Sequence, residues 1–182
     1  MENKALKTDV YTNESLWSQS CEQPVDVDFT LPDYCPDISK IFKCKSVARI
    51  SSKSLNDKSI TVDGSVCITL LYCDKENNLC SFEYQYPFNK VMEIDLDTKG
   101  CNIAVNAKTD YINCRAVTSR KVDIHGAVTI GIRLFCRKSC CIISDIDDKT
   151  IETRRMTAPS TSPMGYAEKY VIVEEEIALS NG

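Results

Sequence analysis

The stretch VDGSVCITLLY, residues 62–72, identifies the fold class of this chain. Val66, Ile68 and Leu70 recur at every second position, with Cys67 and Thr69 between them. Strict alternation of this kind predicts a half-buried β-strand. A second stretch, IHGAVTIGIRL at 124–134, repeats the pattern 62 residues later and aligns Gly64 with Gly126. A glycine inside a strand marks a bulge or a bend, so two copies of one long-strand unit predict two sheets that share a core.

The rest of the chain from residue 44 onward supports an all-β, antiparallel β-sandwich. Segments rich in β-branched and aromatic residues alternate with turn-like ones such as DKENN at 74–78. An earlier stretch, VDVDFTLP at 25–32, also alternates. Pro36 is followed by Ile38, Ile41 and Phe42 at helical spacing, so we expect one short helix here.

For domain organisation, we expect an N-terminal arm or lead-in strand over 1–23 and a single sandwich domain over 24–182. A final strand is predicted at 169–179, and its stretch VEEEIALS at 173–180 resembles VDVDFTLP at 25–32. This strand either closes its own sheet, the commoner role of a terminal strand, or pairs with a neighbouring subunit by strand addition. The candidate exchange interface consists of Val171, Val173, Ile177 and Leu179.

Charge and hydropathy exclude two classes of partner. The formal net charge is −4 and basic residues are scattered, whereas nucleic-acid binders usually carry a basic stripe. No run approaches the roughly 18 apolar residues of a membrane helix, and the N-terminal stretch lacks the apolar core of a signal peptide. We therefore expect no nucleic-acid partner, no membrane insertion and synthesis in a cytoplasm.

The sequence does not predict an enzyme or a cofactor. The single histidine, His125, follows Ile124 in an alternating strand and should face outward if Ile124 faces inward. No P-loop, G-x-S-x-G or G-x-G-x-x-G motif is present. A metal-binding protein is a weaker alternative, because zinc sites favour C-x-x-C pairs and the nearest cluster spaces Cys136 and Cys140 four apart.

Cysteine is the anomaly of the composition, with 11 residues in 182. If hairpins turn within CDKENNLC (73–80) and CRKSCC (136–141), Cys73 lies opposite Cys80 and Cys136 opposite Cys141, which makes these four candidates for intrahairpin disulfides. Cys140 would then face the other way. Together with Cys21 in the N-terminal arm, it is a candidate for an intersubunit disulfide. The alternative is that many of these thiols are small buried apolar residues without partners.

Four segments in order over about 25–155 carry a family resemblance: LPDYCPDISKIFKC, VDGSVCITLLY, YPFNKVMEID and CRAVTSRKVDIHGAVTIGIRL. Through them the chain resembles the SPOCS domain family of spore-forming Clostridia and relatives. The resemblance implies a non-catalytic assembly module of spore-coat morphogenesis. The high cysteine content suggests a specialised, cross-linked member of an outer layer.

These observations predict a structural, self-assembling spore-surface protein of the coat or an appendage. Its subunits would be joined by strand or arm exchange and by intersubunit disulfides. We expect synthesis in the mother-cell cytoplasm, deposition on the spore surface, and partners that are copies of itself or other spore-coat proteins. Two alternatives stay open: a non-polymerising adaptor that recruits another coat protein, and a cysteine-rich metal-binding protein.

Overall fold

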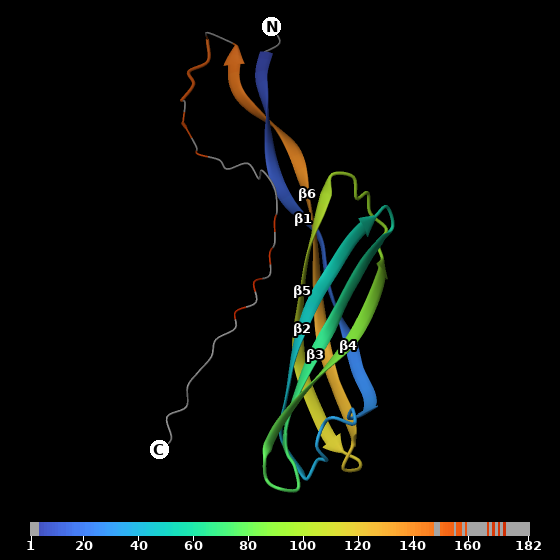
Figure 1. The fold of residues 1–182 in the computed structure, drawn as a ribbon. Helices are drawn as coiled ribbons and strands as arrows, with labels where there is room; N and C mark the ends of the chain where they lie inside the picture. Colours follow the sequence, from blue (N-terminus) through green and yellow to red (C-terminus); the bar gives the residue numbers. More distant parts are fainter. Residues whose placement is uncertain are drawn as a thin grey trace, which may run out of the picture.

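The computed structural model describes residues 4–147, 150–154, 156, 157, 159, 167, 169, 171 and 173. Six strands make up two antiparallel three-stranded sheets (Figure 1). The first sheet has the order β1-β6-β5, and the second has the order β2-β3-β4. The strands are β1 (Lys4–Thr30), β2 (Lys40–Asn56), β3 (Ser59–Cys73), β4 (Leu79–Glu93), β5 (Cys101–Ala116) and β6 (Lys121–Asp147). The predicted all-β sandwich is confirmed.

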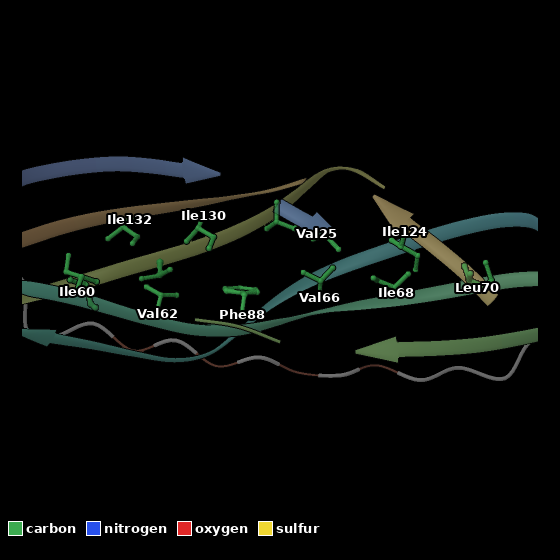
Figure 2. Packing of buried hydrophobic residues seen from close by; sticks show 14 of the residues in the cluster. Val25, Ile60, Val62, Val66, Ile68, Leu70, Phe88, Ile124, Ile130 and Ile132 are labelled. Carbon is green, nitrogen blue, oxygen red and sulfur yellow. The ribbon is translucent and has the colours of Figure 1, made fainter. Parts of the chain in front are cut away.

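The core lies between the central strands of the two sheets. Alternate residues of β3 and β6 are fully or almost fully buried, as the period of two predicts. Full burial of such a branched aliphatic side chain contributes about 1.5–3 kcal/mol. Figure 2 shows these side chains meeting between the sheets. The most buried ones include Ile60, Val62, Val66, Ile68 and Leu70 of β3, and Ile124, Ile130, Ile132 and Leu134 of β6.

The internal repeat is visible in the pairing of strands. β2 pairs with β3 as β5 pairs with β6, and a register shift interrupts each pair close to the repeated glycine. A Cβ atom on Gly64 would lie 2.5 Å from the carbonyl oxygen of Arg49, and one on Gly126 would lie 2.6 Å from that of Tyr111. The glycines therefore mark bulges, as predicted, but the extra residue belongs to the neighbouring strand, which crosses close above them.

The third strand of each sheet comes from a different part of the chain. β4 follows β3 directly, whereas the matching place beside β6 is taken by β1 from the N-terminus. β1 also meets β4, because the Phe29 ring stacks on Tyr84 with centroids 4.6 Å apart. On the other side, Ser46 of β2 donates a hydrogen bond to the Thr109 hydroxyl of β5 at 3.2 Å.

The prediction of a short helix after Pro36 is wrong. Residues 31–39 are irregular, and β2 begins at Lys40. The backbone is held open by the side chain of Arg120, which donates hydrogen bonds to the carbonyl oxygens of Leu31, Pro32 and Cys35 at 2.7–3.2 Å. These bonds fix the segment around a single turn, in which the Cys35 N–H donates to the Pro32 carbonyl at 2.9 Å. Ile41, which the helix would have included, is paired with Tyr72 of β3 instead.

The expected N-terminal arm is part of the sheet. Residues 4–23 belong to β1, which pairs with β6 over its whole length. Of the two expectations for this segment, the structure therefore shows the lead-in strand and not a free arm. Trp17 packs against the core cluster. The predicted final strand, 169–179, falls mostly outside the described residues. Within it, Lys169, Val171 and Val173 are described and have no assigned strand.

Candidate functional site

One end of the β1–β6 pair extends beyond the rest of the domain. β5 begins at Cys101, opposite Cys136, and in the described part of the chain β6 from residue 137 onward pairs with β1 alone. Figure 1 shows the two strands projecting past the other four. We call this overhang, residues 4–14 and 137–147, the ribbon. Its strands present backbone N–H and C=O groups on both outer edges, where a further strand can pair.

The ribbon exposes apolar side chains as well as strand edges. Leu6 and Tyr11 on β1 and Ile142 and Ile143 on β6 have exposed fractions of 44–63%. A two-stranded ribbon without a covering layer is only marginally stable in water. Besides the backbone pairing of β1 with β6, side chains make contacts across the ribbon: Lys138 is ion-paired with Glu14 at 2.7 Å, the guanidinium of Arg137 lies over the Tyr11 ring, and the Thr8 hydroxyl donates to the Ser144 hydroxyl at 2.9 Å. The ribbon is therefore a surface on which another chain would bury apolar area and satisfy backbone groups.

Cys140 and Cys141 lie in the middle of the ribbon, opposite Val10 and Asp9 of β1, and both are exposed. The predicted hairpin turn at Lys138 and Ser139 is wrong, since β6 runs straight through these residues. The strand needs no turn there because β1, not the following segment, supplies its pairing partner. Adjacent residues of a strand point to opposite faces, so the two thiols face opposite sides of the ribbon.

Cys136 is bonded to Cys101, not to Cys141 as predicted. The two residues are directly opposed on β5 and β6, with Cα atoms 4.1 Å apart. A second bridge, Cys44–Cys114, joins β2 to β5 and therefore one sheet to the other. Sequence reasoning missed both bridges. Hairpin spacing carries no information about strands that meet only in the folded sheets.

Cys73 and Cys80 are free thiols, and the expected register between them is wrong by one residue. Cys80 lies opposite Tyr72, and Cys73 lies opposite Leu79. The turn is longer than predicted: Asp74 accepts hydrogen bonds from the backbone N–H groups of Glu76 and Asn78, and Asn77 adopts a φ of 64°. Burial, followed by the nearby Asp74 carboxylate, raises the pKa of the Cys80 thiol and keeps it in its unreactive form.

The remaining predicted site residues are spread over the molecule. Cys21 lies opposite Ile130, is half-buried and packs against the core. Val171 and Val173 are exposed, while Ile177 and Leu179 lie outside the described residues. The structure therefore does not bring Cys21 and Cys140 together, and it singles out Cys140, with its neighbour Cys141, as the accessible thiol pair.

His125 faces outward, as predicted from its neighbour Ile124. It is 58% exposed and lies 3.1 Å from carboxylate oxygens of Asp26 and Asp123, whereas Ile124 is fully buried. Among the described residues, no group of three or more histidine, cysteine or acidic side chains is arranged to hold a metal ion. Nor does that part of the chain include a helix with the length and apolar character needed to cross a membrane.

The fold and the site define an all-β sandwich domain with an exposed strand-pairing ribbon. Residues 37–117 match the family model described as SipL, SPOCS domain, and over this range the chain is similar to the SPOCS domain family. This similarity points to a role connected with sporulation. No curated protein and no solved structure matches the chain. The matched range covers β2 to β5 and stops before β6, so the ribbon lies outside it.

Proposed function

We propose that this protein is a non-catalytic structural component of the spore surface, in the coat or an appendage, and that it assembles with copies of itself through the ribbon. The observation that carries the proposal is the coincidence of open strand edges, exposed apolar residues and two accessible thiols on one projecting element. Open edges are an aggregation hazard for a monomer. In a structural protein the same edges serve as the joint between subunits.

Among the described residues, the thiols of the ribbon have no other cysteine of their own chain within bonding distance. Cys21 lies opposite Ile130, ten positions along β6 from Cys140, which is about 33 Å at the rise of a strand. Cys35 lies at the far end of the domain, beside Arg120, and Cys67 lies on the other sheet. Cys140 and Cys141 point to opposite faces. Oxidation at the ribbon is therefore expected to join two molecules.

The proposed order of events follows from redox compartments. A cytoplasm keeps thiols reduced, so subunits made in the mother cell would meet first through strand pairing. After release, a small-molecule disulfide such as oxidised glutathione would accept the two electrons. Two protein thiols would become one disulfide, and the acceptor would leave as two thiols.

The test is assembly of the purified full chain. Protein kept in reductant is transferred to oxidised glutathione, then examined on non-reducing gels and by negative-stain electron microscopy. We expect covalent dimers on the gel that separate in reductant, and extended assemblies on the grid. A matched control is Cys67→Ser, which removes a half-buried thiol outside the ribbon and should leave the dimer band unchanged. Protein that stays monomeric under these conditions would overturn the proposal.

A second candidate function is an adaptor that recruits another coat protein without polymerising. The exposed apolar residues of the ribbon favour it, since they fit a different chain as well as a copy. An adaptor would remain monomeric when oxidised alone and would form a mixed disulfide only with its partner. The metal-binding alternative is tested separately, by elemental analysis of protein purified in reductant, where stoichiometric zinc would support it.

A further inference from the structure

We infer that the joint between subunits is a two-fold pairing of β6 with β6 of a second copy, centred on Cys140. This inference rests on the proposed function and specifies its geometry. It starts from the length of edge that β6 leaves open. Among the residues that the structure describes, pairing on the side of β5 ends at Cys136, and the next seven residues, 137–143, are regular strand beside β1.

The far limit of this open edge is a bulge. Ser144 is the extra residue between the pairs Lys7–Ile143 and Leu6–Asp145. A bulge bends its strand and ends regular pairing. Suppose that residues 137–143 pair antiparallel with the same residues of a second copy. Ser144 would then lie opposite Cys136 of that copy, where β5 is already paired. The bulge bends the strand away at that point, so two copies can pair along 137–143 without a clash with β5.

The centre of the open edge is Cys140. When two identical antiparallel strands pair about a two-fold axis, the residue on the axis lies opposite its own copy. The midpoint of 137–143 is residue 140, so Cys140 faces Cys140 of the second copy. Directly opposed Cβ atoms lie about 4.5–5.5 Å apart. The chain already makes one bridge between directly opposed residues on this edge of β6, Cys101–Cys136.

The charges of the open edge are compatible with a second copy. Residues 139–143 carry no charged side chain. Lys138 is neutralised by Glu14 of its own ribbon, and Arg137 lies over Tyr11, 4.2 Å from the centroid. The pairing sets Lys138 opposite Ile142 of the second copy and Ser139 opposite Cys141. Two ribbons therefore meet without opposing like charges, and the exposed Ile142 and Ile143 are covered.

The test compares Cys140 and Cys141, two adjacent thiols that are both exposed. Cys140→Ser and Cys141→Ser full-length proteins are oxidised with oxidised glutathione and run on non-reducing gels. We expect Cys141→Ser to form covalent dimers as the wild type does, and Cys140→Ser to lose at least nine-tenths of them. A rescue variant, Ser139→Cys with Cys140→Ser, should regain dimers through residue 139 of one copy and Cys141 of the other.

The outcomes separate this inference from the proposed function. Dimers that persist in Cys140→Ser, or a rescue variant that stays monomeric on the gel, would overturn the two-fold pairing even if electron microscopy still shows assemblies. Monomers of the wild type in oxidised glutathione, with no assemblies on the grid, would overturn the proposed function itself. Loss in Cys140→Ser together with rescue by the double variant supports the pairing.

Discussion

Cys44 of β2 is bonded to Cys114 of β5, with Cα atoms 6.1 Å apart, and this bridge ties together the facing edges of two sheets that share no backbone pairing. Close to it, the Ser46 and Thr109 hydroxyls are also in hydrogen-bond contact between the same two strands. The sandwich is therefore fastened covalently along this side. On the opposite side, β1 and β4 meet through the stacked rings of Phe29 and Tyr84.

Removing this bridge should lower the stability of the oxidised protein. The bridge closes a span of 70 residues, and the loss of loop-closure entropy in the unfolded chain corresponds to about 4 kcal/mol for a span of this length. We expect the Cys44→Ala, Cys114→Ala double variant to unfold at a lower denaturant concentration by that order, measured by circular dichroism. In excess reductant the difference from the wild type should largely vanish; a difference that persists there would mean that packing, not the bridge, is responsible.

Gly64 and Gly126 should tolerate no side chain. An added Cβ would lie 2.5 Å and 2.6 Å from backbone carbonyl oxygens of the neighbouring strands, which cannot move without breaking the sheet. We expect Gly64→Ala and Gly126→Ala each to cost about 2–3 kcal/mol in the free energy of unfolding.

The matched control for these glycines is Gly131→Ala on β6. Its Cβ would meet the side-chain oxygen of Asn106 at 2.5 Å, and a side chain can rotate away. The expected cost is below about 1 kcal/mol. Equal losses at Gly131 and Gly126 would contradict the role of the crossing backbone.

Arg120 should be needed for the conformation of residues 31–39. Its guanidinium donates to three backbone carbonyls and lies 3.0 Å from the Asp37 carboxylate. Arg120→Ala would remove the donors of a partly buried, charged cluster, for which we expect a loss of about 1.5–3 kcal/mol. Arg120→Lys should recover less than half of it, because one ammonium cannot reach all of these oxygens. Thermal unfolding of both variants is the measurement.

Tyr72 should make stability fall at alkaline pH. Burial raises the pKa of its phenol to about 12, above the ordinary value of about 10. Between pH 10 and 12 the unfolded chain loses this proton while the folded protein keeps it, so the free energy of unfolding falls as pH rises through this window and its contribution is intact below pH 10.

The comparison that isolates this effect is Tyr72→Phe. The variant loses a hydrogen bond from the Tyr72 hydroxyl to the Pro36 carbonyl at 3.2 Å, so it should be less stable than the wild type at pH 8. The difference between the two proteins should shrink from pH 10 to 12 in denaturant titrations. A constant difference across that range would rule out an elevated pKa.

Much of the fold could be predicted from the alternation of apolar residues. The period of two in 62–72 and 124–134 predicted the strands, their inward faces and the outward direction of His125, because successive side chains of a strand point to opposite faces of the sheet. The repeated Gly64 and Gly126 also predicted the positions of the bulges. Each of these features depends on residues that are close together in the sequence, so the sequence alone was enough to predict it.

The candidate site could be predicted only in part from the sequence, because it depends on which strands pair with each other. CRKSCC at 136–141 has the composition of a turn, yet β1 pairs with it and keeps it extended. Cys44 and Cys114 are 70 residues apart, and nothing in their spacing indicates that β2 and β5 face each other. The helical spacing after Pro36 was overridden by contacts with distant parts of the sequence: Ile41 pairs with Tyr72 of β3, and Arg120 donates a hydrogen bond to the Cys35 carbonyl.

The length of the ribbon has a consequence for any material built from this protein. If two copies overlap over residues 137–143, the ends of their β5 strands stay about eight residues apart along the joint, or about 26 Å. Only one four-stranded sheet, made of the two ribbons, would cross that interval, so the joint would be thinner than the two sandwich bodies that it connects.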